Sequence, residues 1–113
     1  MDVSMLVGLQ EELIADLTSE LQNEPTFDSS VLRQKVINAI REVKKERKYP
    51  SYYLSDLISK DLYEFYSNIR NIALYDYNKV GAEGELTHSE NGISRSYVDR
   101  KNLFSGVLPI SRF

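Results

Sequence analysis

The chain has 113 residues, no cysteine, one histidine and a formal net charge of −3. This length suits a single domain over 1–113, and 42% apolar with 27% charged residues is ordinary for a soluble globular protein. The lack of cysteine excludes disulfides, thiolate metal sites and a cysteine nucleophile. No run approaches the roughly 18 apolar residues of a membrane span, and the acidic N-terminus is unlike a signal peptide.

The first expected element is an amphipathic helix of about five turns that ends before Pro25. Apolar residues recur there every four positions: Met5, Leu9, Leu13, Leu17 and Leu21. Residues 1–27 also carry six acidic side chains and no Lys or Arg. One face of this helix is therefore expected to be buried, while the segment as a whole is acidic.

A second helix is expected to begin at Asp28, Ser29 or Ser30, whose side-chain oxygens suit an N-cap. Its buried stripe is predicted to be Leu32, Val36, Ile40 and Val43, widened by Ile37. Residues 28–48 carry seven basic side chains against three acidic ones. An acidic segment followed by a basic one can pair within the chain or between neighbouring copies.

The second helix closes in a basic run that forms a candidate basic surface: Lys44, Lys45, Arg47 and Lys48. Cations in the last turn of a helix interact favourably with the helix dipole, so the run also has a purely structural explanation.

A third, long helix is expected to begin near Ser51 or Ser55, run to about Asn78 and stop at Gly81. Its apolar positions step by four or three residues: Leu54, Ile58, Leu62, Phe65, Ile69 and Ile72. The helical core would then cover about residues 4–80. Because the connections are short, the predicted fold is mainly α, a small three- to four-helix antiparallel bundle.

Asn91-Gly92 is a strong signal for a two-residue turn and predicts a β-hairpin over about 85–97 that projects from the bundle. One face of this hairpin would carry Leu86, His88, Glu90, Ile93, Arg95 and Tyr97. A lone two-stranded ribbon is marginal in water, so the bundle or another subunit must support it. The extended C-terminal tail, 98–113, is too apolar to be solvated and either packs back on the bundle or docks on a partner.

The hairpin region holds the only histidine but does not make an active site. His88 and Ser89 are neighbours on a strand and point to opposite faces. His88 and Glu90 offer two metal ligands without a third or fourth. The glycines of 81–84 follow a helix and lie beside glutamates, unlike a phosphate loop. We therefore predict no catalytic residue, metal, cofactor or small-molecule substrate.

Seven of the eight tyrosines lie between residues 49 and 77. On the wheel of one continuous helix, a strip beside the apolar stripe carries Tyr52, Tyr63, Tyr66, Tyr77 and Arg70. Tyrosine and arginine are enriched at the centres of protein interfaces. Two interpretations stay open: the strip contacts another subunit, or it edges the intramolecular core.

Three strings in the chain are distinctive: Tyr49-Pro50, IRNIALYDYN at 69–78 and VGAEGELTHSENGISRSY at 80–97. Over roughly residues 30–97 they resemble the head–tail connector (adaptor, head-completion) proteins of tailed bacteriophages and prophages. This resemblance implies a structural virion protein and not an enzyme. Family members form a ring, typically dodecameric, below the portal, where they extend the DNA channel and receive a stopper or tail-completion protein.

The expected partners are therefore the portal protein, a stopper or tail-completion protein and further copies of the chain, with incidental contact to packaged DNA and none to a membrane. The expected location is the head–tail interface of the virion, and the host bacterial cytoplasm during assembly. The candidate assembly interface combines the hairpin with the tyrosine strip: Leu86, His88, Glu90, Asn91, Gly92, Ile93, Arg95, Tyr97, Tyr52, Tyr63, Tyr66, Arg70 and Tyr77.

Two further expectations follow. The free protein is expected to be a monomer whose hairpin and tail become ordered on portal binding, because neither has an evident core to fold against. The alternative function is a small helical DNA-binding or regulatory protein that uses the basic 44–48 segment, although the net charge of the chain is negative.

Overall fold

The computed structural model describes residues 2–83 and 100–110, and the side chains of 7–79 and 100–110. The elements are α1 (Asp2–Leu21), α2 (Ser29–Arg47), α3 (Ser55–Tyr63), α4 (Tyr66–Glu83) and a short 3-10 helix, η2 (Arg100–Phe104). The described residues contain no strand. The predicted hairpin over 85–97 lies outside them, and the structure gives it no support.

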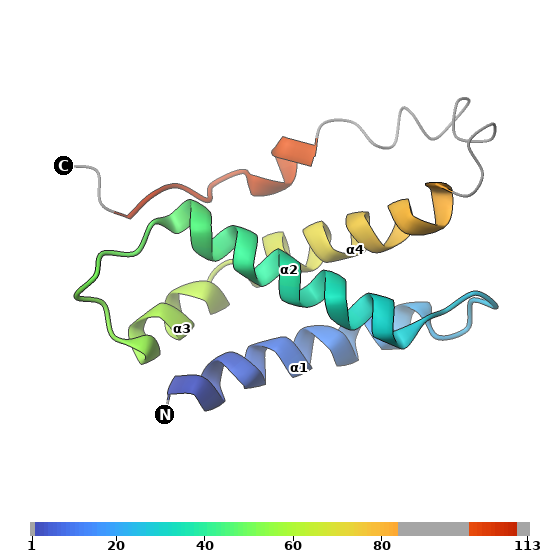
Figure 1. The fold of residues 1–113 in the computed structure, drawn as a ribbon, viewed down its shortest axis with the longest axis horizontal. Helices are drawn as coiled ribbons and strands as arrows, with labels where there is room; N and C mark the ends of the chain where they lie inside the picture. Colours follow the sequence, from blue (N-terminus) through green and yellow to red (C-terminus); the bar gives the residue numbers. More distant parts are fainter. Residues whose placement is uncertain (1, 84–99, 111–113) are drawn as a thin grey trace.

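The helices form an antiparallel bundle, which confirms the predicted mainly α class (Figure 1). α2 returns alongside α1, and α3 and α4 together run back along the bundle in the direction of α1. α1 packs against α2 and α3, while α4 packs against α2 and η2. The connection between α2 and α3 lies at one end of the molecule, and α4 ends at the other.

The two apolar stripes predicted for α1 and α2 meet in the core. Leu9, Leu13 and Leu17 are fully buried on α1. On α2 the buried residues are Leu32, Val36, Ala39, Ile40 and Val43. Ile37, which was expected to widen the α2 stripe, is only half-buried. Asp28 caps α2 as predicted, because its carboxylate accepts hydrogen bonds from the backbone N–H groups of Ser30 (3.0 Å) and Val31 (3.2 Å).

The prediction of one long third helix was wrong. The chain leaves the helix at Glu64 and Phe65, whose N–H groups bond three residues back to Asp61 (3.0 Å) and Leu62 (2.9 Å). Such bonds tighten the last turn of a helix without a proline or glycine. The break separates α3, which packs on α1, from α4, which packs on α2.

Both predicted boundaries of this helix also differ from the structure. The N-cap of α3 is Leu54, which makes no side-chain capping bond, so neither Ser51 nor Ser55 serves as the cap. At the other end, α4 continues through Gly81 to Glu83. A glycine inside a helix costs only about 1 kcal/mol relative to alanine, so it does not by itself end one.

The tail packs back on the bundle over residues 100–110, which corrects the expectation that it lacks an intrachain core. Val107 is buried, and Leu103 and Phe104 pack against the core from its edge. The amide of Asn68 on α4 donates to the carbonyl oxygens of Leu103 (2.9 Å) and Ser105 (3.1 Å). The tail is therefore part of the folded monomer over this range.

Candidate interaction surface

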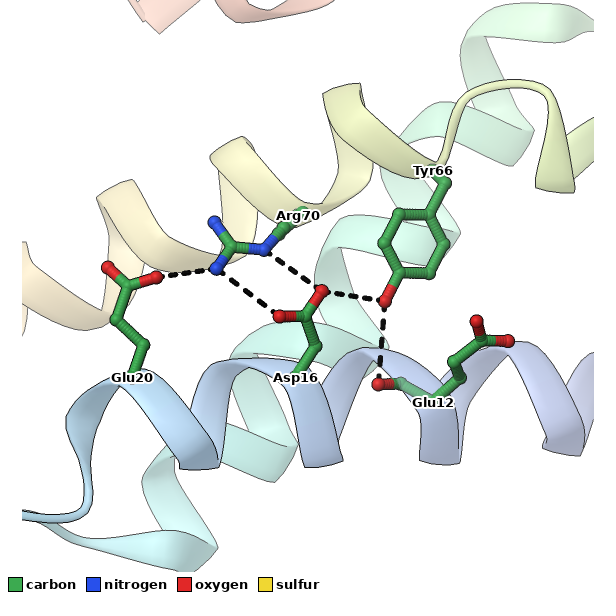
Figure 2. Close-up of polar contacts among 5 residues, drawn as sticks. All are labelled: Glu12, Asp16, Glu20, Tyr66 and Arg70. Carbon is green, nitrogen blue, oxygen red and sulfur yellow. Dashed lines mark hydrogen bonds and ion pairs between the residues drawn. The ribbon is translucent and has the colours of Figure 1, made fainter.

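Two members of the tyrosine strip, Tyr66 and Arg70, point toward α1 (Figure 2). Glu12, Asp16 and Glu20 follow one another at intervals of four residues, so they project from the same side of α1. The Tyr66 hydroxyl donates to Asp16 Oδ2 at 2.8 Å, and Arg70 Nε donates to the same oxygen at 3.1 Å. These contacts form a polar seam between α1 and α4.

Two further contacts extend the seam along α1. Arg70 also bonds Glu20, one turn beyond Asp16. On the other side, the Tyr63 hydroxyl at the end of α3 donates to Glu12 Oε1 at 3.3 Å. The acidic side chains of α1 are thus matched by residues from both halves of the broken third helix.

The seam changes the proton affinities of its members. The Arg70 guanidinium and then the Tyr66 hydroxyl stabilise the carboxylate of Asp16 and hold its pKa below the ordinary 3.8. Burial, reinforced by the hydrogen bond to Asp16, raises the pKa of Tyr66 to about 12. At neutral pH Asp16 is therefore ionised, and Tyr66 keeps its proton and can donate to it.

Tyr77 is also engaged within the chain. Its hydroxyl accepts a hydrogen bond from the backbone N–H of Asp28 at 2.9 Å. Its ring packs on Phe27, with 6.3 Å between ring centroids. For Tyr63, Tyr66, Arg70 and Tyr77, the contacts therefore favour the interpretation that the strip edges the intramolecular core.

Tyr52 does not belong to this strip. The helical wheel placed Tyr52 beside the other tyrosines because it assumed one continuous helix. In the structure Tyr52 lies in the connection before α3. It is 78% exposed. The other candidate interface residues, Leu86, His88, Glu90, Asn91, Gly92, Ile93, Arg95 and Tyr97, lie outside the described residues.

Sequence reasoning missed a cluster around Arg47 that fastens the tail to the bundle. The Arg47 guanidinium makes two bonds to Asp61 on α3, at 2.8 and 2.9 Å, and donates to the Leu108 carbonyl oxygen at 2.6 Å. The Tyr49 hydroxyl donates to Asp61 at 2.7 Å. Burial, followed by the neighbouring Asp61, raises the pKa of Tyr49. The spacing of residues in the sequence does not predict this cluster, because its members come from different elements.

Arg100 fastens the start of the same tail. It bonds Asp76 on α4 (2.7 and 2.9 Å) and pairs with Glu42 on α2 (3.0 Å). These hydrogen bonds, with Asp76 contributing most, raise the pKa of the guanidinium. Arg100 also lines a shallow depression of about 360 Å³ with Glu42, Glu46, Lys101 and Phe104. The mixture of acidic and basic walls gives this depression no evident preference for a charged ligand.

The basic run divides into two kinds of residue. Arg47 is mostly buried in its contacts with Asp61 and the tail. Lys44, Lys45 and Lys48 are exposed and make no ion pair with any residue whose side chain is described. The acidic and basic segments themselves meet through Arg33, which pairs with Glu11 at 2.9 Å. A basic surface built from 44–48 therefore rests on three lysines and not on Arg47.

The end of the molecule between α2 and α3 exposes apolar side chains. Tyr52, Leu54 and Leu57 are 78%, 71% and 45% exposed. Leu57 lies one turn from Leu54, since its N–H bonds the Leu54 carbonyl oxygen. We call Tyr52, Leu54 and Leu57 the apolar end.

A ladder of aromatic rings supports the apolar end from beneath. Tyr52 packs on Tyr53 with 5.6 Å between centroids, and Tyr53 packs on Tyr49 at 5.8 Å. Tyr49 is in turn held by Asp61. The exposed Tyr52 ring is thus connected through Tyr53 and Tyr49 to the Arg47 cluster.

Other features can be stated for the part of the chain that the structure describes. It holds no group of three or more His, Cys, Asp or Glu side chains arranged for a metal ion. None of its helices is both long and apolar enough to span a membrane. Comparison of the chain with protein-family models, curated proteins and solved structures finds no match.

Proposed function

We propose that the protein is a head–tail connector of a tailed bacteriophage or prophage, a structural virion protein without enzymatic activity. The observation that carries this proposal is the resemblance of 69–78 and 80–97 to that family. In this function, copies of the chain form a ring below the portal, extend the DNA channel and provide a docking surface for a stopper or tail-completion protein.

The fold is compatible with this function. The bundle is small and mainly helical, as the family's chains are. α4 ends at Glu83, at the end of the molecule opposite the α2–α3 connection, so the most distinctive string begins where the bundle stops (Figure 1).

The segment 85–97 is assigned the role of this contact element. A variant that lacks residues 85–97 should fold, because the core residues lie within 9–73 and at Val107. We expect it to lose binding to heads that contain the matching portal, measured by co-sedimentation and electron microscopy. A matched control keeps the length of the segment and replaces only Thr87, Ser89, Ser94 and Ser96 by alanine. Unchanged binding by the deletion variant would contradict the assignment.

Binding of the wild-type chain to these heads tests the proposed function itself. Electron microscopy should show density for the chain in a ring beneath the portal. Failure of the intact chain to bind portal-containing heads, combined with salt-sensitive binding to duplex DNA that is lost when Lys44, Lys45 and Lys48 are neutralised, would favour the DNA-binding alternative.

A further inference from the structure

The tail over residues 100–110 is bound by a small set of residues on α2 and α4. Arg47 donates to the Leu108 carbonyl oxygen at 2.6 Å, and the Ile110 N–H bonds the Arg47 carbonyl oxygen at 2.8 Å. At the other end of the tail, Arg100 bonds Asp76 at 2.7 and 2.9 Å. We call the bundle residues that bind the tail in this way the tail site: Glu42, Arg47, Asn68 and Asp76.

Apolar burial adds only a small number of contacts to this attachment. Val107 is buried and Leu103 and Phe104 are half-buried, whereas Leu108 is 60% exposed. The other residues of the buried core lie between 9 and 73, within the four helices and their connections. The tail can therefore leave the tail site while the helices keep their core, and the site then presents the same partners to any tail of this sequence.

The chain between α4 and the tail is much longer than the attachment within one molecule needs. α4 rises about 10 Å from Asp76 to its end at Glu83. Because Arg100 contacts Asp76, the residues that flank 84–99 lie within roughly 20 Å of each other. A chain of the length of 84–99 spans up to about 50 Å when fully extended. This length is sufficient for the tail of one copy to reach the tail site of a neighbouring copy.

We propose that neighbouring copies of the chain exchange tails, so that residues 100–110 of one copy occupy the tail site of the next. Each contact within one chain has an identical counterpart between chains, which makes such an exchange a low-cost route to association. In dilute solution the tail stays on its own bundle, because the connection holds it there at an effective concentration in the millimolar range. Exchange becomes favourable where copies are concentrated together.

The occupant of the tail site follows from the contacts themselves. Arg100 meets the carboxylates of both Asp76 and Glu42, and Asn68 donates to two backbone carbonyl oxygens of the tail. A second copy carries the same arginine and the same carbonyl oxygens at the same spacing. The tail and its site are different surfaces, so exchange can be reciprocal in a pair or continue around a closed ring. The inference does not require the proposed function, although it would supply a lateral contact for a ring.

A charge exchange between Arg100 and Asp76 tests whether the tail crosses between copies. Asp76→Lys weakens the site for the native tail, and Arg100→Asp weakens the tail for the native site, because like charges then meet. In a mixture of the two variants, exchange pairs the introduced lysine with the introduced aspartate and restores the native pair in the other site. The matched control carries both substitutions in one chain, where the pair is restored without exchange.

We expect the mixture to form one-to-one complexes, measured by sedimentation equilibrium and native mass spectrometry at low salt, because salt screens such pairs. Their dissociation constant should be at least about tenfold below that of either variant alone. The wild-type chain and the double variant should be monomeric at the same micromolar concentrations. Circular dichroism of each variant checks that the helices are retained.

A covalent trap detects even a small exchanged population, because the chain has no cysteine of its own. Glu46 on α2 and Lys101 of the tail are exposed and line the same shallow depression, and neither belongs to the tail site. Glu46→Cys and Lys101→Cys are placed in separate chains, mixed at high concentration and treated with a short bismaleimide. We expect about tenfold more cross-linked heterodimer than from Lys101→Cys mixed with Ser19→Cys, an exposed position on α1.

The proposal is overturned if the mixed charge variants keep their helices but stay monomeric, or if the double variant associates as strongly as the mixture. It is equally overturned if the cross-linked heterodimer does not exceed the Ser19→Cys control. Should a charge variant lose its helices, the cross-linking result decides, because it changes only exposed side chains. If the chain binds portal-containing heads but does not exchange tails, this inference fails while the proposed function stands.

Discussion

Asp16 shows how a single carboxylate can join two helices. It accepts hydrogen bonds from both Tyr66 and Arg70 of α4 (Figure 2). Its side chain is 37% exposed, so solvent screens part of the attraction to the guanidinium. The benefit of this contact depends on the ionised state of Asp16, which makes it measurable through pH.

Replacing Asp16 by asparagine should lower the free energy of unfolding by about 1 kcal/mol at neutral pH, because the charged hydrogen bonds are lost. The folded pKa of Asp16 lies below 3.8. The stabilisation is therefore present above that pH and disappears as the pH falls through the folded pKa. Urea unfolding at neutral and acidic pH should show the wild-type and Asp16→Asn curves converging in acid. Glu24→Gln is the control, because this exposed side chain makes no hydrogen bond or ion pair with a described residue; a gap that persists in acid would contradict this account.

Tyr66 makes the stability of the same seam depend on pH in the alkaline range. Its pKa is raised to about 12, first by burial and then by Asp16. Since the folded pKa lies above the ordinary 10.0, its contribution to stability is complete below pH 10 and is lost as the pH rises toward 12. An ultraviolet titration of the folded protein should lose one late-ionising tyrosine in Tyr66→Phe. In Asp16→Asn the same tyrosine should ionise earlier, though still late because burial remains.

At the scale of the elements, the sequence predicted three apolar stripes but not the break in the third. Leu62, Ile69 and Ile72 are all fully buried, so the spacing of buried apolar residues continues across the break at Glu64 and Phe65. A periodicity that continues across a tight turn cannot reveal that turn. The break becomes visible only through packing, since α3 packs mainly on α1 and α4 packs mainly on α2.

The candidate site was predicted less well for a related reason. The strip of tyrosines with Arg70 was recognised from the sequence, but its acidic partners lie about 50 residues away on α1. Residue type alone does not say whether such a strip meets a neighbour or its own chain. Arg47 was assigned to a basic surface because its partner Asp61 belongs to another helix.

The start of α3 offers a test of how the N-cap residue affects stability. Leu54 occupies the N-cap with extended backbone angles (φ −83°, ψ 157°) and gives the helix no side-chain bond. Aspartate is among the best N-cap residues, so Leu54→Asp should raise the free energy of unfolding by about 1 kcal/mol. Denaturant unfolding checks this. Leu54→Asn separates the capping bond from the added charge, and a destabilised Leu54→Asp protein would contradict the assigned cap.

At the scale of the whole molecule, the tail is part of the folded unit over residues 100–110. Arg47 and Arg100 hold its two ends, and Asn68 holds its middle. Val107 is only 5% exposed. A tail held in this way belongs to the free monomer, whereas the lack of an evident core in the sequence had suggested that the tail becomes ordered on portal binding.

Removing residues 100–113 should therefore destabilise the isolated protein. The loss of Val107 and of the half-buried Leu103 and Phe104 from the core should lower the free energy of unfolding by about 3–5 kcal/mol. Newly exposed apolar surface should bind a hydrophobic dye that the intact chain ignores. As a control, replacing the exposed Asn102 of the tail by alanine should leave both properties unchanged. Equal stability of the intact chain and the chain lacking 100–113 would instead mean that the tail becomes ordered only when a partner binds.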